Sequence, residues 1–164
     1  MFRVGDKVAH PMHGAGVIDG IVTETVAGGS QDYYVFRMPV GGLVLKIPTA
    51  ASAAVGLRSV GDPVKAAKLL RDLTMLEVER FTGSWNQRYR ENMQKIKSGD
   101  LYEVARVAKG LVRRDRERGL STGERKMLRS AKQILISEMV LSMEEEYHAI
   151  ETQVNAAMSG GQAV

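Results

Sequence analysis

The local sequence pattern changes near residue 50, and this change limits the chain to a fold made of two unlike parts. Before it, runs of β-branched and aromatic residues at 17–23, 33–38 and 43–47 are separated by the glycine pairs 28–29 and 41–42. Such runs and turns predict antiparallel hairpins. Several short strands so close together favour a small, strongly bent sheet or barrel.

After residue 50 the pattern is helical. Asp62-Pro63 predicts a helix start, because an N-cap residue is followed by a proline in the first turn. Ser84 with Gln87, and again Ser121 with Glu124, has the spacing of a capping box. The apolar periodicity predicts helices at 64–73, 85–97 and 101–118 and a long helix from 121 to about 150.

These two patterns predict a two-domain α+β protein with an all-α C-terminal domain. The predicted boundaries are a small β-barrel at 1–55, a linker at 56–62, a helical domain at 63–155 and a disordered tail at 156–164.

Composition and short motifs argue against several classes of protein. The 164 residues include no cysteine, which excludes disulfides, thiolate zinc sites and cysteine nucleophiles. No apolar run reaches the ~18 residues of a membrane helix and no signal segment is recognisable, so we expect a cytoplasmic protein. Gly14-Ala15-Gly16 lacks the spacing of a nucleotide-binding loop, and no nucleophile elbow or P-loop pattern occurs. We therefore expect no enzyme, cofactor, metal or small-molecule substrate.

Charge is distributed unevenly along the chain. Residues 1–79 carry 8 basic and 8 acidic side chains. Residues 80–132 carry 15 basic and 6 acidic side chains, a net charge of +9, whereas residues 133–164 carry 5 acidic side chains and no lysine or arginine. The central block attracts a polyanion through counterion release from phosphates. A solvated helical surface is the alternative interpretation of the same charges.

An isolated aromatic residue stands at the start of this basic block. Trp85 is the only tryptophan, and Tyr89 follows one helical turn later. An indole that projects outward beside cations stacks on bases or wedges between them, while the cations hold phosphates. An indole packed in the helical core is the alternative. The nearby cations that we take as candidate DNA ligands are Arg88, Arg90 and Lys97.

A second basic cluster lies at the junction of the next two predicted helices. Arg114 belongs to the run 113–118, where arginines also interact with the helix dipole. Arg125, Arg129 and Lys132 share one face of the following helix by i,i+4 and i,i+3 spacing. This spacing favours a surface for a phosphate backbone over helix capping alone.

The order of several motifs resembles that of the CarD/CdnL family of bacterial transcription regulators. These motifs extend over about residues 2–145, in both halves of the chain. They are Phe2-Arg3-Val4-Gly5-Asp6-Lys7-Val8, His10-Pro11-Met12-His13-Gly14-Ala15-Gly16, Met38-Pro39-Val40-Gly41-Gly42, Ile47-Pro48, Trp85-Asn86-Gln87-Arg88-Tyr89-Arg90, Lys97-Ser98-Gly99-Asp100, Arg113-Arg114-Asp115 and Gly119-Leu120-Ser121-Thr122-Gly123-Glu124-Arg125-Lys126-Met127-Leu128.

The resemblance implies an N-terminal SH3- or Tudor-like module that docks on the β subunit of RNA polymerase. Docking of this kind pairs an exposed strand with a strand of the partner. Lys46 matches a basic position of the docking surface, and Leu45, Ile47 and Pro48 belong to the same segment. Glu24 stands where some members carry a basic residue.

The resemblance also implies that the helical domain contacts promoter DNA, largely independently of sequence, at the upstream edge of the transcription bubble. The residue that matches Trp85 wedges into the minor groove and slows collapse of the bubble, and Arg88 and Arg90 match its basic neighbours. Gln87 replaces a residue that is often arginine. We therefore predict a monomeric, nucleoid-associated regulator that binds the polymerase and stabilises the open promoter complex.

Two other functions stay open at this point. Helices at 100–118 and 121–150 could form the helix-turn-helix of a sequence-specific repressor, although their apolar stripes are more typical of bundle packing. A small metal-dependent enzyme would use His10, His13 and Asp19. Pro11 separates the two histidines and no carboxylate is patterned nearby, which favours packing within a turn.

Overall fold

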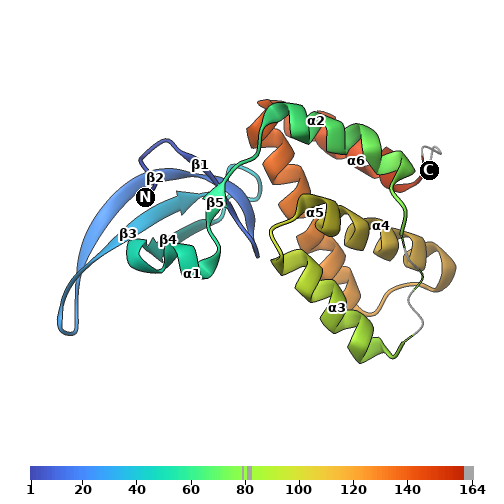
Figure 1. Cartoon of the computed structure of the whole chain (residues 1–164), viewed down its shortest axis with the longest axis horizontal. Coiled ribbons are helices and arrows are strands. Elements are labelled where there is room, and N and C mark those ends of the chain that lie inside the picture. Colours follow the sequence, from blue (N-terminus) through green and yellow to red (C-terminus); the bar gives the residue numbers. More distant parts are fainter. Residues whose placement is uncertain (79, 81–82, 161–164) are drawn as a thin grey trace.

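The computed structural model describes residues 1–78, 80 and 83–160 and divides the chain into a β module and a helical domain (Figure 1). The strands are β1 (Lys7–His10), β2 (Gly14–Val26), β3 (Gly29–Arg37), β4 (Val44–Pro48) and β5 (Arg58–Ser59). They form an antiparallel sheet in the order β4-β3-β2-β1-β5. The helices of the second part are α2 (Pro63–Asp72), α3 (Trp85–Lys97), α4 (Leu101–Arg118), α5 (Thr122–Met143) and α6 (Tyr147–Met158). The predicted α+β class with two domains is confirmed.

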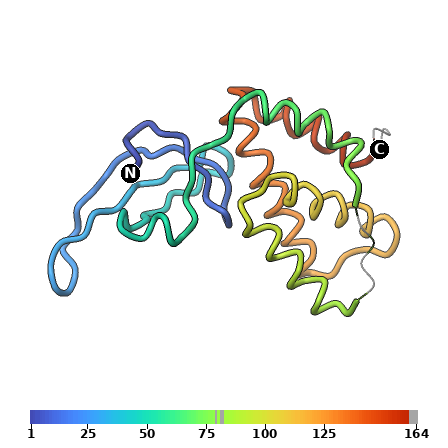
Figure 2. Tube along the Cα trace, in the orientation of Figure 1, coloured from blue at the N-terminus to red at the C-terminus, as the bar shows by residue number. Residues whose placement is uncertain are grey.

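The β module has its own apolar core. Alternate residues of the strands point inward, as the period of two requires. The buried set is Val8, Ile18, Tyr34, Phe36, Met38, Ile47 and Leu57. The long β2–β3 hairpin extends beyond this core on the side away from the helices (Figure 2).

The predicted linker at 56–62 is wrong in part. A short helix, α1 (Ser52–Val55), ends at Gly56, and the next residue, Leu57, is buried in the core of the β module. Arg58 and Ser59 then pair with β1 as strand β5. A strand of two residues carries no periodicity, so it is recognisable only from its pairing in the folded chain.

The predicted helix starts are confirmed by their caps. The Asp62 side chain accepts a hydrogen bond from the backbone N–H of Val64 at the start of α2. Both capping boxes are present, Ser84 with Gln87 on α3 and Ser121 with Glu124 on α5. Each box satisfies backbone N–H groups that the first helical turn leaves without a partner.

The predicted long helix at 121–150 is wrong, because it consists of two helices. Glu144 adopts a left-handed conformation, with φ of 53°, and ends α5. Glu146 caps α6, which turns back so that Ile150 and Val154 join the core of the helical domain. Burial of Met158 also shows that the predicted tail at 156–164 begins too early, and residues 161–164 lie outside the described part.

A buried lysine holds the segment that leaves α2. The Nζ of Lys109 on α4 donates hydrogen bonds to the carbonyl oxygens of Leu73, Thr74 and Leu76 at 2.7, 2.9 and 2.8 Å. Burial, with a smaller effect of the nearby Arg113, lowers the pKa of this lysine below its usual value. The three carbonyls match the three N–H donors of the ammonium group. The start of the connection to α3 is therefore fixed against α4.

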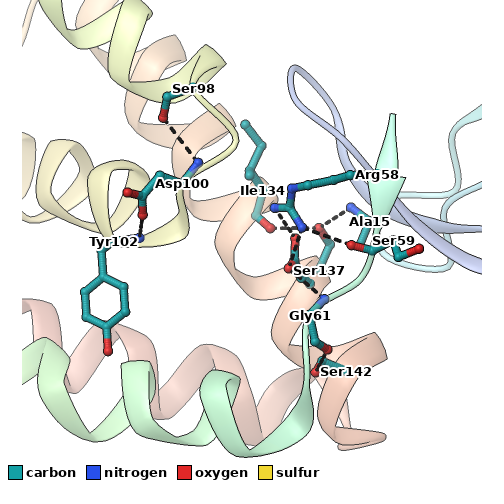
Figure 3. Close-up of polar contacts among 11 residues, drawn as sticks. Ala15, Arg58, Ser59, Gly61, Ser98, Asp100, Tyr102, Ile134, Ser137 and Ser142 are labelled. Atoms are coloured by element: carbon teal, nitrogen blue, oxygen red, sulfur yellow. Dashed lines mark hydrogen bonds and ion pairs between the residues drawn. The ribbon is translucent and has the colours of Figure 1, made fainter. Parts of the chain in front are cut away.

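Helix α5 packs directly against the β module. The hydroxyl of Ser137 accepts a hydrogen bond from the backbone N–H of Ala15 at 2.9 Å and donates one to the carbonyl of Ile134 at 3.1 Å (Figure 3). Gly14 has φ of 112°, and a Cβ there would overlap the Ser137 hydroxyl. The β1–β2 turn and α5 can approach so closely because this position is glycine.

A buried carboxylate completes the interface between the domains. Glu138 is 2% exposed. Its two oxygens accept hydrogen bonds from Arg58 at 2.8 and 3.1 Å, and the backbone N–H of Gly61 donates a third at 3.2 Å. The Ser142 hydroxyl donates to the Gly61 carbonyl at 2.6 Å (Figure 3). A bidentate pair with further hydrogen bonds is the geometry in which a buried charge is well compensated.

We predict that Glu138→Leu lowers the free energy of unfolding by about 1–3 kcal/mol, because the guanidinium of Arg58 and the N–H of Gly61 lose their acceptor. Urea denaturation measures this loss. Glu144→Leu is the matched control, since Glu144 also pairs with a cation of the β module, Lys7, but is exposed. Equal effects of the two substitutions would contradict the prediction.

Candidate nucleic-acid interface

Trp85 stands at the first position of α3, directly after the Ser84 cap. Its side chain is 44% exposed. The indole stacks on Tyr89, with ring centroids 5.2 Å apart and an interplanar angle of 21°. Tyr89 in turn packs against the apolar core of the helical domain. The indole therefore projects outward, as predicted, from a support that the core holds in place.

The first turn of α5 forms the base of this aromatic pair. A Cβ placed on Gly123 would lie 3.7 Å from a ring carbon of Trp85 and 3.7 Å from one of Tyr89. The start of α5 therefore lies beside both rings, with room for no more than a methyl group between them. Arg125 follows two residues later on the same helix and is exposed.

Two of the predicted DNA ligands converge on an acidic residue of the chain itself. The Nε of Arg88 donates a hydrogen bond to Oε2 of Glu124 at 3.2 Å, and the Nε of Arg114 lies 3.4 Å from the same oxygen. The side chain of Arg88 is only 12% exposed. Sequence reasoning identified Glu124 as a cap and missed this role. In the sequence Glu124 is one of three acidic residues in the basic run 113–132, with Asp115 and Glu117, so no signal there marks it as the partner of the two arginines.

The remaining predicted DNA ligands lie on the surface. None of them forms an ion pair with another residue of the described ranges. They are Arg90, Lys97, Arg125, Arg129 and Lys132. Lys97 is at the far end of α3, ~18 Å from Trp85 along the helix axis. A Cβ on Gly99, next to that end, would lie 3.6 Å from Arg58 of the β module. The structure therefore does not bring Lys97 close to the indole.

Gln87 has a local role that explains its side chain. Its Oε1 accepts a hydrogen bond from the backbone N–H of Ser84 at 3.2 Å, and its own N–H donates to the Ser84 hydroxyl at 3.3 Å. Glutamine is one of the two residues that complete a capping box at this position, whereas arginine cannot accept this bond. The glutamine thus stabilises the helix turn that carries Trp85.

The segment predicted to bind the polymerase forms the outer strand β4. No described strand pairs with the free edge of β4. Lys46 is exposed and forms an ion pair with Glu24 of β2. Ile47 faces the core of the β module, and Leu45 and Pro48 are half-buried. Of the candidates in this segment, only Lys46 is therefore exposed, whereas Ile47 belongs to the core.

The two N-terminal histidines pack against each other within a turn. The ring centroids of His10 and His13 are 4.5 Å apart, and Nδ1 of His10 accepts a hydrogen bond from the backbone N–H of Met12 at 3.1 Å. Asp19 lies 3.4 Å from Arg37 in an ion pair. Within the described ranges, no three His, Cys, Asp or Glu side chains are grouped as metal ligands. No described helix has the length and apolarity to cross a bilayer.

Comparison with known proteins assigns both halves of the chain. Residues 2–61 match the CarD-like/TRCF RID domain, and residues 78–155 match the CarD C-terminal domain. The chain is 37% identical over 139 residues to a Bacillus subtilis (strain 168) protein named "Putative transcription factor YdeB". The aligned region covers 85% of this chain and 90% of that protein.

The chain belongs to the CarD family. Its members are non-enzymatic transcription factors, and this one carries an RNA polymerase-interaction domain that coincides with the β module, strand β5 included. The match to the CarD C-terminal domain starts before α3 and ends within α6, so α2 lies between the two matched units. In this CarD-family chain the polymerase-interaction domain and the candidate nucleic-acid interface are therefore on separate domains.

We predict that the stability of the protein falls between pH 6.5 and 4 because His10 becomes protonated. Burial, with a smaller contribution from His13, lowers the pKa of His10 from 6.5 to about 4 in the folded chain. The stabilisation that depends on the neutral ring is therefore complete above pH 6.5 and decreases as the pH falls towards 4. Urea midpoints measured at pH 7.5 and pH 5 test this.

The control for this measurement is His10→Asn, whose side-chain oxygen can accept the same N–H of Met12 without titrating. Carboxylate titration contributes equally to both chains. The midpoint should decrease more for the natural chain than for the variant, and identical decreases would refute the role of His10.

Proposed function

We propose that this protein binds the β subunit of RNA polymerase through its β module, contacts promoter DNA at the upstream edge of the transcription bubble, and stabilises the open complex. It acts as a monomer in the cytoplasm, at the nucleoid. The observation that carries the proposal is the exposed indole of Trp85 on a stacked aromatic support, in a domain whose cations Arg90, Arg125 and Arg129 form no ion pair within the described ranges.

The electrostatics of the helical domain support a nucleic-acid partner. The exposed cations Arg90, Arg125 and Arg129 and the half-buried Lys132 attract phosphates and position the domain on DNA without selecting a sequence. The indole adds a contact that closed duplex does not offer, because an aromatic wedge enters where bases are already partly unstacked. The domain therefore suits a partly melted duplex better than a specific operator.

The sheet edge supports a protein partner at the other end of the molecule. Strand β4 is an edge strand, and no strand of the described residues pairs with its outer side, which is what strand addition requires. Lys46 of this strand provides a charge at the rim, and Glu24 already compensates part of that charge within the chain. We infer that polymerase docking combines backbone pairing along β4 with an electrostatic contribution that Glu24 weakens.

The mechanism is differential binding. A protein that binds the melted fork more tightly than closed DNA shifts the equilibrium towards the open complex by the difference in binding free energy. A contact between a base and an aromatic side chain contributes about 1–3 kcal/mol, so Trp85 alone can shift the equilibrium roughly 5- to 150-fold. Polymerase docking keeps the indole near the fork.

A sequence-specific helix-turn-helix built from α4 and α5 is less well supported. A recognition helix needs one face free to enter the major groove. Every residue of α5 from Ile134 to Met139 is buried. The β module covers one side of this segment, and the other helices cover its remaining faces. A stable dimer with a palindromic DNA site would nevertheless favour this alternative.

We predict that Trp85→Ala shortens the lifetime of the open complex by roughly 5- to 150-fold while polymerase binding stays unchanged. The lifetime is measured with the organism's own polymerase holoenzyme, on a promoter with an unstable bubble, after addition of a competitor. Trp85→Phe keeps an aromatic ring over Tyr89 and should give an intermediate lifetime. An unchanged lifetime for Trp85→Ala would defeat the proposal.

We also predict that Lys46→Glu and Glu24→Gln change binding to the purified β subunit in opposite directions. The first substitution places a second carboxylate beside Glu24 and should weaken binding by about tenfold. The second frees the ammonium of Lys46 and should strengthen binding. Lys65→Glu on α2, which makes the same change in net charge on an exposed helix, is the control and should have little effect. Surface-immobilised β subunit gives the affinities, and a matching loss for Lys65→Glu would contradict docking through β4.

A further inference from the structure

The Glu124 carboxylate is the point at which three helices meet. It is 4% exposed and belongs to the first turn of α5. One oxygen, Oε2, lies 3.2 Å from the Nε of Arg88 on α3 and 3.4 Å from the Nε of Arg114 on α4. The other, Oε1, accepts hydrogen bonds from the backbone N–H and hydroxyl of Ser121 at 3.4 and 3.2 Å. Both oxygens are therefore engaged within the protein.

The groups around this carboxylate and around the indole are neighbours on the same two helical turns. Arg88 follows Trp85 by three residues, so both side chains lie along one side of the first turns of α3. Glu124 directly follows Gly123, which lies beside the Trp85–Tyr89 stack. A displacement of α3 along α5 would disturb the ion pair and the aromatic contact together.

Apolar packing alone holds the beginning of α3 weakly. Ile96, near the opposite end, is the fully buried residue of this helix, whereas Tyr89 and Met93 are partly exposed. The link between Arg88 and Glu124 is therefore a principal tie between the Trp85 end of α3 and the rest of the domain. Helix ends without such ties open locally at low free-energy cost.

The electrostatic balance keeps Glu124 charged. Burial opposes its ionisation, but hydrogen bonds from Arg88 and the Ser121 backbone and the charges of Arg88 and Arg114 outweigh this effect, and the pKa of the carboxyl lies below its usual value. The Nε of Arg114 is buried and makes no hydrogen bond to any described group. The charge of the nearby Glu124 carboxylate therefore compensates the burial of this guanidinium nitrogen. Without Glu124, two guanidinium groups would face each other with no anion between them.

We propose that Glu124 is a positioning residue for Trp85: its carboxylate binds Arg88 and Arg114 at once, fixes the start of α3 on α4 and α5, and so aims the indole. Arg88 and Arg114 accordingly act within the domain, and the phosphate contacts come from the exposed cations such as Arg125. This inference rests on the proposed function for its consequence at the promoter, but the positioning itself is a property of the free protein.

Fluorescence of the free protein tests the positioning, because Trp85 is the only tryptophan. The variant is Glu124→Gln, which removes the charge but keeps a side chain that completes a capping box, as Gln87 does on α3. The expected result is lower indole anisotropy and a higher acrylamide quenching constant. Glu103→Gln, which breaks the ion pair with Arg106 elsewhere on α4, is the matched control and should change neither.

Unchanged anisotropy and quenching in Glu124→Gln would overturn the proposal. If Glu124→Gln does not fold, the same measurement is made on Arg88→Ala, because this variant removes the partner of Glu124 on α3. With polymerase and promoter, Glu124→Gln should shorten the open-complex lifetime by about fivefold, the lower end of the range for one lost base–aromatic contact. The fluorescence measurement uses no DNA, so it fails or succeeds independently of the proposed function.

Salt dependence separates positioning from direct phosphate contact. Each phosphate contact adds about 0.9 to the slope of log K against log salt concentration. Arg88→Ala should therefore leave the slope for duplex DNA unchanged, whereas Arg125→Ala should reduce it by about 1. A reduction of about 1 for Arg88→Ala would show that this arginine contacts DNA directly, and would overturn its assignment to Glu124.

Discussion

The structure depends on α5, because this one helix contacts both functional regions. Near its C-terminal end, Ser137 and Glu138 hold the polymerase-interaction domain through buried hydrogen bonds and a bidentate ion pair. At its N-terminal end, Gly123 and Glu124 support the helix turn that carries Trp85. The two carboxylates are 14 residues apart, which places them ~21 Å apart along the helix axis. The separation between the polymerase-interaction domain and the indole is thus set by one continuous helix rather than by a linker.

This rigidity has an energetic consequence for the proposed function. When two binding regions are joined without flexibility, binding of the first confers a high effective concentration on the second, provided that the geometry matches. Little conformational entropy is then lost when the indole reaches the fork, because the buried contacts between the domains have already ordered it. A flexible segment at the predicted linker 56–62 would have diluted this effect. The pairing of Arg58 and Ser59 with β1 and the bonds from Arg58 and Gly61 to Glu138 replace that linker with part of the interface.

The features that the sequence predicted correctly are those coded by near neighbours. Ser84 with Gln87 and Ser121 with Glu124 locate helix starts because all the groups involved lie within four residues. The features it could not predict depend on distant partners. The break at Glu144 is stable because α6 returns to the core, and the pairing of Arg88 with Glu124 joins residues 36 positions apart. Spacing rules therefore identified Trp85 and the nearby arginines as candidates. They could not distinguish an arginine exposed to solvent from one paired with a buried carboxylate.

That distinction changes how strongly the helical domain can hold DNA by itself. With Arg88 and Arg114 directed to Glu124 and Lys97 at the far end of α3, the candidate DNA ligands that remain are Arg90, Arg125, Arg129 and Lys132. Four phosphate contacts correspond to a slope of log K against log salt concentration of only about −4, which is smaller in magnitude than that of proteins that find DNA sites unaided. Weak intrinsic affinity suits a protein that is delivered by the polymerase, since it leaves closed and unrelated DNA largely unoccupied. Under the proposed function, the buried Glu124 limits the basic surface while it positions the indole, and both effects would favour a promoter that the polymerase has already opened.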